Sequence, residues 1–351
     1  MTQINASKAY KRTVNRLGLC LLVMLGLMST VGFIPMLLES ILAEWLGSNA
    51  VLVIGGVAET VCYMSYFIVP AILFYTLMGK YPTQPIRFKV KMPWTTPLMI
   101  ISGMAIILFF AQINAWVLDL IGYESSLVGG FGEQIDSPAA IVMYMTISFA
   151  PAIAEEILFR GVVFGNLRPY GRGVAIMGSA VLFGLMHQTP EQIIYTIAAG
   201  IVLALVYEFT GSIWCCTFLH LFNNLYSVIQ SVLFGLKDQL LAQNILLMMD
   251  IIIYVIGAVS LTILFAVAWH RSTVSTETAE KADKKEGRSP QGSWFGAYPS
   301  HTDENDVVVT THSSQAVIRP FVTTPGMLIY IILTILTILL TLAEGFIGGI
   351  L

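Results

Sequence analysis

Long apolar stretches, each ended by a short group of polar residues, recur along most of the chain. A helix needs about 20 apolar residues to cross the roughly 30 Å hydrocarbon core of a membrane. Nine stretches fit this description: 17–42, 51–78, 95–121, 138–167, 174–187, 193–207, 213–234, 245–269 and 327–351. The fifth and sixth are short, and only Gln188-Thr189-Pro190-Glu191 separates them. The pattern predicts an all-α, polytopic membrane helix bundle with about eight core spans and a C-terminal ninth span.

The composition agrees with a membrane protein. Hydrophobic residues make up 56% of the chain and charged residues 11%, with a mean hydropathy of +0.78. The four cysteines (Cys20, Cys62, Cys215 and Cys216) all lie in apolar stretches and have no metal-binding C-x-x-C spacing. We expect a cytoplasmic segment at 1–16 followed by an uncleaved first span and a membrane core at 17–270.

Residues 271–326 differ from the rest because they are rich in Ser, Thr, Glu, Lys and Pro. We predict a mostly disordered cytoplasmic linker, with a short strand at 306–311 as its one candidate element. His301 and His312 are expected to be solvated there. Residues 327–351 then form the C-terminal transmembrane span.

The basic residues predict the orientation of the chain in the membrane. If the N-terminus is inside, 17 of the 18 Lys and Arg residues fall on the cytoplasmic side, and Lys237 is the exception. The linker is then also inside and the C-terminus outside. The net charge of −3 says little about partners.

The fourth apolar stretch contains three ionisable residues, Glu155, Glu156 and Arg160. Such residues are costly at membrane depth and are candidates for function. Arg160 follows Glu156 by four residues, so both lie on one helix face. Glu155 is about 100° away and can point elsewhere. We therefore interpret Glu156–Arg160 as an ion pair that holds the site, and Glu155 as the working carboxylate.

Two histidines and an asparagine lie in later spans: His187, His220 and Asn224. Counting 1.5 Å per residue from the predicted cytoplasmic ends puts Glu155, His187 and His220 at similar depths, between about 14 and 20 Å. We expect these three residues to line one cavity together with Glu156, Arg160 and Asn224. We expect it to open toward the cytoplasm or laterally into the inner leaflet.

A carboxylate, two imidazoles and an amide at one depth suit hydrolysis. The glutamate can take a proton from a water molecule that attacks a carbonyl carbon. An imidazole or amide N–H can donate to the oxyanion that forms.

Three motifs in order carry a family resemblance: Glu-Glu-x-x-x-Arg (Glu155 to Arg160), Phe-x-x-x-His (Phe183 to His187) and His-x-x-x-Asn (His220 to Asn224). Over about 139–227 the chain resembles the CAAX protease and bacteriocin-processing family of intramembrane proteases, which includes the type II CAAX prenyl endopeptidases. The resemblance implies an all-helical membrane core.

The resemblance also implies a role for each motif residue. Glu155 would be the base, and His187 would help to hold the attacking water. His220 and Asn224 would bind the oxyanion, while Glu156 and Arg160 would orient the site. The expected partners are the lipid bilayer and a membrane-associated peptide or protein, such as a prenylated protein or a bacteriocin precursor, and no nucleic acid. This preferred interpretation requires no cofactor.

Several alternatives stay open. Glu155, His187 and His220 could bind zinc with one open position, as in a metalloprotease. Cys216 lies one turn before His220, which makes a Cys–His dyad geometrically possible. A peptide-binding pseudoenzyme, a membrane scaffold or a proton-coupled transporter is the non-enzyme alternative. Further acids lie in or near the spans: Glu39, Glu59, Asp119, Glu208 and Asp250. In a proton relay these acids should form a row from one membrane face to the other, whereas a protease needs only a single cluster of catalytic residues.

Overall fold

The computed structural model describes residues 3–91, 93–123, 148–286 and 314–348. All regular elements within these residues are helical, which confirms the predicted all-α class. The strand expected at 306–311, His301 and His312 lie outside the described residues, so the structure does not test them.

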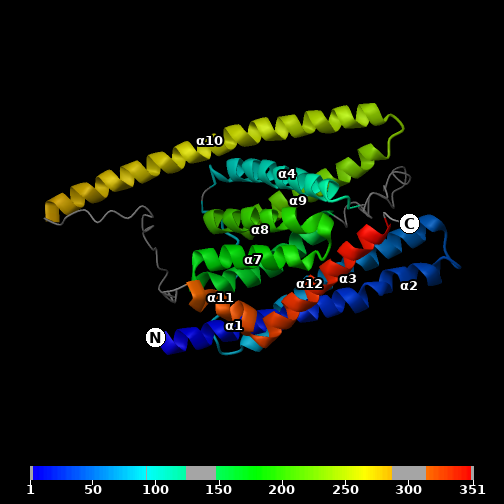
Figure 1. Ribbon diagram of the computed structural model, residues 1–351, viewed down its shortest axis with the longest axis horizontal. Coiled ribbons are helices and arrows are strands. Elements are labelled where there is room, and N and C mark those ends of the chain that lie inside the picture. The colour runs from blue at the N-terminus through cyan, green and yellow to red at the C-terminus, as the bar shows by residue number, and fades with distance from the viewer. Residues whose placement is uncertain (1–2, 92, 124–147, 287–313, 349–351) are drawn as a thin grey trace.

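The elements follow one another as a bundle of mostly antiparallel helices (Figure 1). They are α1 (Gln3–Val31), α2 (Phe33–Leu42), α3 (Ser48–Met78), α4 (Thr96–Leu120), the helical residues 148–156, η1 (Ile157–Phe164), α6 (Gly165–Leu167), η2 (Arg168–Tyr170), α7 (Arg172–Met186), α8 (Pro190–Thr210), α9 (Ile213–Phe234), α10 (Gln239–Glu286), α11 (Ser314–Thr323) and α12 (Pro325–Gly348).

Six of the described helical stretches are long and apolar enough to cross a membrane. They are Ser7–Leu42, Ala50–Met78, Thr96–Leu120, Pro190–Thr210, Gln239–His270 and Pro325–Glu344. Arg172–Met186 is a shorter apolar helix, as the sequence predicted for the fifth span. The protein is therefore an integral membrane protein with a helical bundle as its core.

The first predicted span consists of two helices, α1 and α2, that meet at Gly32. Pro35 lies three residues later and has no N–H to donate to a carbonyl one turn earlier. A proline near a glycine is a usual cause of such a break.

The helix that carries the Glu-Glu-x-x-x-Arg motif changes its winding within the motif. Residues 148–156 are α-helical, but Ile157–Phe164 form a π-helix. All residues from Leu158 to Phe164 are buried, including Arg160. Short π-helical segments are rare and are often found at functional sites. Within this segment Arg160 lies in the protein interior, beside the ring of Phe183 on α7 and the backbone carbonyl of Gly200 on α8.

The C-terminal span packs tightly against the first. A Cβ atom at Gly18 of α1 would lie 2.1 Å from the backbone nitrogen of Met327, so only glycine fits there. The side-chain oxygen of Asn15 accepts a hydrogen bond of 2.8 Å from the N–H of Gly326. Tyr330 is fully buried and donates to the carbonyl of Leu182 on α7 at 3.3 Å. The ninth span is thus joined to the bundle by close backbone contact.

The predicted linker contains two helical pieces. α10 continues past the membrane stretch as far as Glu286, and α11 occupies Ser314–Thr323 directly before α12. The expectation of a mostly disordered linker is therefore wrong for these two ends. The part between them lies outside the described residues. The charged stretch after His270 contains Thr, Glu, Ala and Lys, and the last three are good helix formers that can extend an existing helix.

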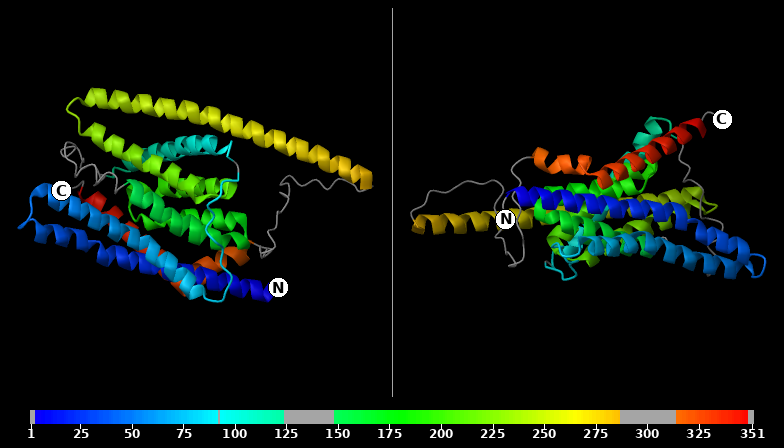
Figure 2. Two further views of the ribbon diagram at one scale, coloured as in Figure 1. Left: turned by 180° about the vertical axis from the view of Figure 1, so that it is seen from behind. Right: turned by 90° about the horizontal axis from the view of Figure 1, so that it is seen from below.

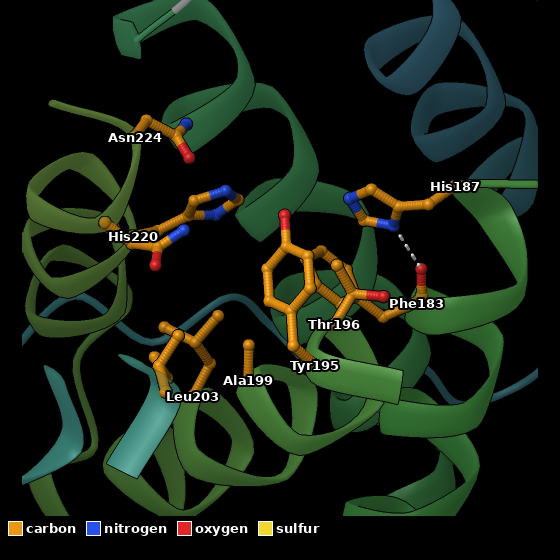
Figure 3. A pocket seen from close by; sticks show the side chains of 10 residues that line it. Phe183, His187, Tyr195, Thr196, Ala199, Leu203, His220 and Asn224 are labelled. Carbon is orange, nitrogen blue, oxygen red and sulfur yellow. Dashed lines mark hydrogen bonds between the residues drawn. The ribbon is translucent and has the colours of Figure 1, made fainter. Parts of the chain in front are cut away.

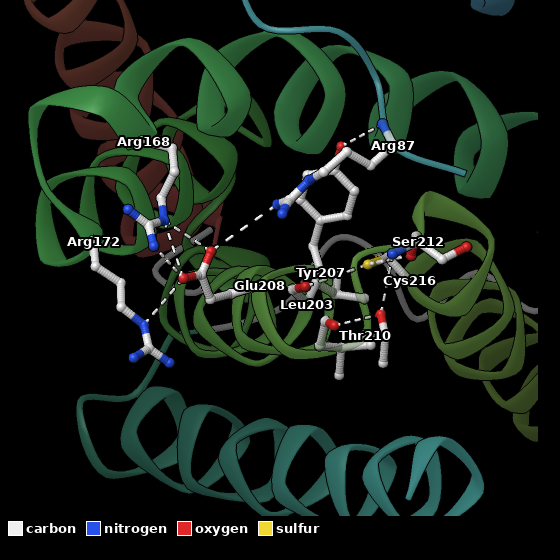
Figure 4. Close-up of polar contacts among 10 residues, drawn as sticks. Arg87, Arg168, Arg172, Leu203, Tyr207, Glu208, Thr210, Ser212 and Cys216 are labelled. Carbon is white, nitrogen blue, oxygen red and sulfur yellow. Dashed lines mark hydrogen bonds and ion pairs between the residues drawn. The ribbon is translucent and has the colours of Figure 1, made fainter. Parts of the chain in front are cut away.

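A cluster of basic residues surrounds Glu208 in the last turn of α8 (Figure 4). Arg168 contacts both carboxylate oxygens of Glu208, and its shortest contact is 2.7 Å. Arg172 lies 3.2 Å from the same carboxylate, and Arg87 lies 4.0 Å away. The N-terminus, α11 and the end of α10 lie toward one end of the bundle, and the C-terminus lies toward the other (Figures 1 and 2).

Candidate active site

A cavity of about 240 Å³ lies among α3, residues 148–156, α8 and α9. Four of the six predicted site residues line it: Glu155, His187, His220 and Asn224. The structure thus brings together residues from three separate motifs. Figure 3 shows that His187 and His220 approach from opposite sides, with the hydroxyl of Tyr195 between them.

Glu156 and Arg160 do not line this cavity, which corrects the expectation that all six residues would do so. Both side chains are completely buried behind it. The Nε atom of Arg160 lies 3.2 Å from Oε2 of Glu156, which is the ion pair that the sequence predicted. Nη2 of Arg160 donates to the carbonyl of Gly200 on α8 at 3.3 Å. This pair therefore supports the cavity wall from inside the protein.

Glu155 is 2% exposed and lies at the cavity surface. Its Oε1 accepts a short hydrogen bond from the hydroxyl of Tyr63 on α3. Its Oε2 is buried, has no hydrogen-bond partner among the described residues, and lies 3.9 Å from Nε2 of His220. Buried polar atoms almost always have a partner, so an unpaired carboxylate oxygen at a cavity suggests a water molecule or substrate.

His187 follows the last residue of α7, and its ring orientation is fixed by its own helix. Nδ1 lies 2.9 Å from the carbonyl oxygen of Phe183. A carbonyl can only accept, so Nδ1 carries the hydrogen. In the neutral imidazole, Nε2 is then an acceptor. That nitrogen can accept a hydrogen bond from a water molecule in the cavity.

His220 connects the two glutamates. Its Nδ1 lies 2.9 Å from Oε1 of Glu156, and its Nε2 faces Glu155. An ionised carboxylate can only accept, so Nδ1 is then the donor. When both ring nitrogens carry a hydrogen, Nε2 also presents an N–H on the side of the cavity.

Asn224 lies one turn after His220 on α9 and is half-buried. Its Nδ2 donates to the carbonyl of Ser148 at 3.2 Å. An amide nitrogen carries two hydrogens, so one donor is left for a ligand. The His-x-x-x-Asn spacing thus places two donors on one face of α9.

The contacts of Phe183 show why the first position of the Phe-x-x-x-His motif is an aromatic residue. Its ring centroid lies 5.0 Å from the ring of His187 and 5.9 Å from that of His220, both edge-to-face. The guanidinium carbon of Arg160 lies 4.4 Å from the same ring centroid. One aromatic ring therefore packs against three of the predicted site residues, and the Arg160 contact is a cation–π interaction.

The cavity lies toward the end of the bundle that is opposite the basic cluster. On α9 the lining continues from His220 outward to Ser231, near the last residue of that helix. On α8 it includes Gln192 and Tyr195 in the first two turns, whereas Glu208 lies in the last turn. The cavity therefore does not open beside the basic cluster, which the sequence places on the cytoplasmic side. The membrane face on which it opens stays a prediction.

The zinc alternative requires three ligands around one point. Within the described part of the chain, no group of three His, Cys, Asp or Glu side chains is placed to hold a metal ion. Because Oε1 of Glu155 and Nδ1 of each histidine already have partners, a zinc ion would have to bind to Oε2 of Glu155 and to Nε2 of the two histidines. The zinc alternative stays a prediction.

Sequence reasoning missed several cavity residues, above all Tyr63, Gln192 and Tyr195. Gln192 and Tyr195 are three residues apart, so they share a face at the start of α8, and this polar spacing was visible in the sequence. Tyr63 is 92 residues from Glu155, and no local pattern pairs the two.

Residues 137–226 match the family model of the type II CAAX prenyl endopeptidase Rce1-like family. This part of the chain is therefore similar to an Rce1-like domain. This segment includes all three motifs and every predicted site residue. Tyr63 lies outside it.

The chain is also similar to a curated protein. The Bacillus subtilis (strain 168) protein named "Putative membrane peptidase YdiL" is 30% identical over 133 residues, which cover 35% of this chain and 53% of that protein. The chain thus matches about half the length of this relative. No solved structure matches the chain.

Proposed function

We propose that the protein is an intramembrane endopeptidase that cleaves a peptide bond with a water molecule activated by Glu155. The observation that carries this proposal is the unpaired Oε2 of Glu155, which is held at a cavity that also includes two histidines and an asparagine. The Rce1-like domain and the similarity to a protein named as a membrane peptidase support the same activity.

In the first step, water is held between Oε2 of Glu155 and Nε2 of His187. Glu155 takes a proton from the water, and the water oxygen forms a bond to the carbonyl carbon of the substrate. The carbonyl oxygen becomes an oxyanion. The same proton then passes from Glu155 to the leaving amine nitrogen as the carbon–nitrogen bond breaks. No covalent intermediate with the enzyme is formed.

The oxyanion is stabilised by donors on α9. His220 and Asn224 both line the cavity; His220 donates from Nε2 when both of its ring nitrogens carry a hydrogen, and Asn224 donates from its second N–H. Glu156 accepts from Nδ1 of His220, and Arg160 pairs with Glu156. One oxyanion donor typically contributes a factor of about 100 to 1,000 to the rate.

A zinc-dependent mechanism with Glu155, His187 and His220 is the second enzyme candidate. The hydrogen bonds from Nδ1 of the two histidines would support it, because zinc-bound histidines usually donate their other nitrogen to a carbonyl or carboxylate. Among the residues that the structure describes, no three such side chains converge on one point, which favours the glutamate mechanism. A chelation experiment separates the two.

The positions of the other acidic residues favour an enzyme over a proton relay. Glu208 is paired with the basic cluster, and Asp250 accepts a hydrogen bond from Tyr226. Glu39 packs against Gly55, and neither it nor Glu59 lines the cavity. These acids do not form a row that passes through the cavity.

The orientation that we propose puts the N-terminus, the basic cluster and the helical extension of α10 in the cytoplasm, with the C-terminus outside. The count of basic residues supports this orientation. The cavity then lies in the outer half of the membrane. A membrane-associated peptide that enters from the outer side suits this position better than a prenylated protein that is anchored on the cytoplasmic face.

Replacement of the proposed base tests the function. Glu155→Gln keeps the size of the side chain and removes the base, so we expect the cleavage rate of a membrane-peptide library to fall by about 100-fold or more. Glu59→Gln is the matched control, since it makes the same change on α3 outside the cavity. A Glu155→Gln protein as active as the control would overturn the proposal.

A further inference from the structure

Tyr63 reaches the candidate site from outside the segment that matches the family model. It lies on α3, and its hydroxyl donates to Oε1 of Glu155. No other hydrogen bond to the carboxylate of Glu155 occurs among the described residues. Tyr63 also lines the cavity itself. It is therefore placed to control the orientation of this carboxylate.

Packing holds the ring of Tyr63 in position. Its centroid lies 5.2 Å from that of Phe67 and 5.8 Å from that of Tyr66, both on α3. Phe67 in turn lies 6.5 Å from Phe159, which belongs to the π-helix that follows Glu155. A tyrosine has few rotatable bonds, so packing of the ring fixes its hydroxyl. The donor and the carboxylate are thus connected through one aromatic cluster.

Because the hydroxyl of Tyr63 is held in place, the two carboxylate oxygens of Glu155 are not equivalent. The last torsion of a glutamate side chain is soft, so a free carboxylate would sample many orientations. With Oε1 occupied by Tyr63, Oε2 is the oxygen that points toward Nε2 of His220 at 3.9 Å. Oε2 is then the oxygen without a hydrogen-bond partner among the described residues, and the one placed to receive a proton.

We propose that Tyr63 is a positioning residue that holds Oε1 of Glu155, so that Oε2 receives the proton from the attacking water. This inference rests on the proposed function. Tyr63 itself neither gains nor loses a proton in the reaction. The α3 span is thereby part of the active site, although it lies outside the Rce1-like domain.

The test compares Tyr63→Phe with Tyr66→Phe in the full-length protein, using the membrane peptide that the wild-type protein cleaves. Loss of a hydrogen bond to a charged group changes a rate or equilibrium constant by a factor of about 10 to 100. We therefore expect kcat of Tyr63→Phe to fall by that factor, while KM stays within about twofold of the wild-type value. Tyr66→Phe removes a hydroxyl one turn away, outside the cavity, and should keep the wild-type kcat.

A double variant separates positioning from a general structural effect. In the Glu155→Gln background, Tyr63→Phe should cause no further loss of the residual rate, because the carboxylate that it positions is absent. Each of four outcomes would overturn the inference. They are a wild-type kcat in Tyr63→Phe, an equal loss of kcat in Tyr66→Phe, a full additional loss of rate in the double variant, and failure of Tyr63→Phe to fold. Full activity of Glu155→Gln would instead overturn the proposed function.

Discussion

Nδ1 of His220 lies 2.9 Å from Oε1 of Glu156, although the two residues are 64 positions apart in the sequence. This contact links His220 of the third motif to Glu156 of the first motif. Phe183 of the second motif packs on His220, and Arg160 of the first motif pairs with Glu156. Glu156 therefore has two charged or chargeable partners in a place from which water is excluded.

Replacement of Glu156 should affect both stability and activity. Glu156→Gln leaves Arg160 as a buried charge without its carboxylate, which typically costs about 3–5 kcal/mol. We expect a lower thermal unfolding midpoint of the purified protein in detergent and a large loss of activity. Glu155→Gln, one residue earlier, should lose activity and keep its unfolding midpoint. Equal midpoints for the two variants would contradict this division between a structural and a catalytic glutamate.

Metal removal tests the proposed mechanism against the zinc alternative. Because the described side chains do not present three ligands to one point, we expect cleavage to continue after prolonged treatment with a chelator. Metal analysis of the same active preparation provides the control. Stoichiometric zinc whose removal abolishes the activity and whose return restores it would establish the zinc mechanism with Glu155, His187 and His220 instead.

The contact between the first and ninth spans can be tested with two glycines of α1. A Cβ atom at Gly18 would lie 2.1 Å from backbone of α12, so Gly18→Ala must push the helices apart, at a cost of about 1–3 kcal/mol. Gly26 has nothing within 4 Å of such an atom, so Gly26→Ala should leave the stability unchanged or slightly higher. The measurement is thermal unfolding in detergent. Equal effects of the two substitutions would show that α12 is not packed on α1 in solution.

The sequence predicted the parts of the site that depend on local spacing. The ion pair of Glu156 and Arg160 follows from a four-residue separation, and the shared face of His220 and Asn224 follows from the same rule. The helical class followed from the apolar stretches. These features need no knowledge of how distant helices pack.

The features that were missed depend on long-range packing or on unusual winding. Tyr63 contacts Glu155 only because α3 packs against η1, and nothing near either residue indicates this. The π-helix at 157–164 lies in an apolar run that looks like ordinary α-helix. The extent of the cavity was not predicted, because its lining continues along α9 to Ser231, beyond the motif residues that were used for counting.

The last prediction concerns the side of the membrane from which the cavity is reached. Cysteines at Gly47 and Gly173 can mark the two ends of the bundle, since both glycines are exposed and neither has an atom within 4 Å of an added Cβ. Gly47 precedes α3, and Gly173 lies beside the basic cluster. The four native cysteines are buried, so the unmodified protein gives the background.

An impermeant thiol reagent applied to intact cells should label Gly47→Cys and leave Gly173→Cys unmodified until the membrane is opened. Ser227→Cys reports on the cavity, because Ser227 lines it and is exposed. We expect it to react from the outside, as Gly47→Cys does, and more slowly when a cleavable peptide is present. Labelling of Ser227→Cys only from the side that reaches Gly173→Cys would instead put the cavity on the cytoplasmic side, which would make cytoplasmic, membrane-anchored proteins the natural substrates.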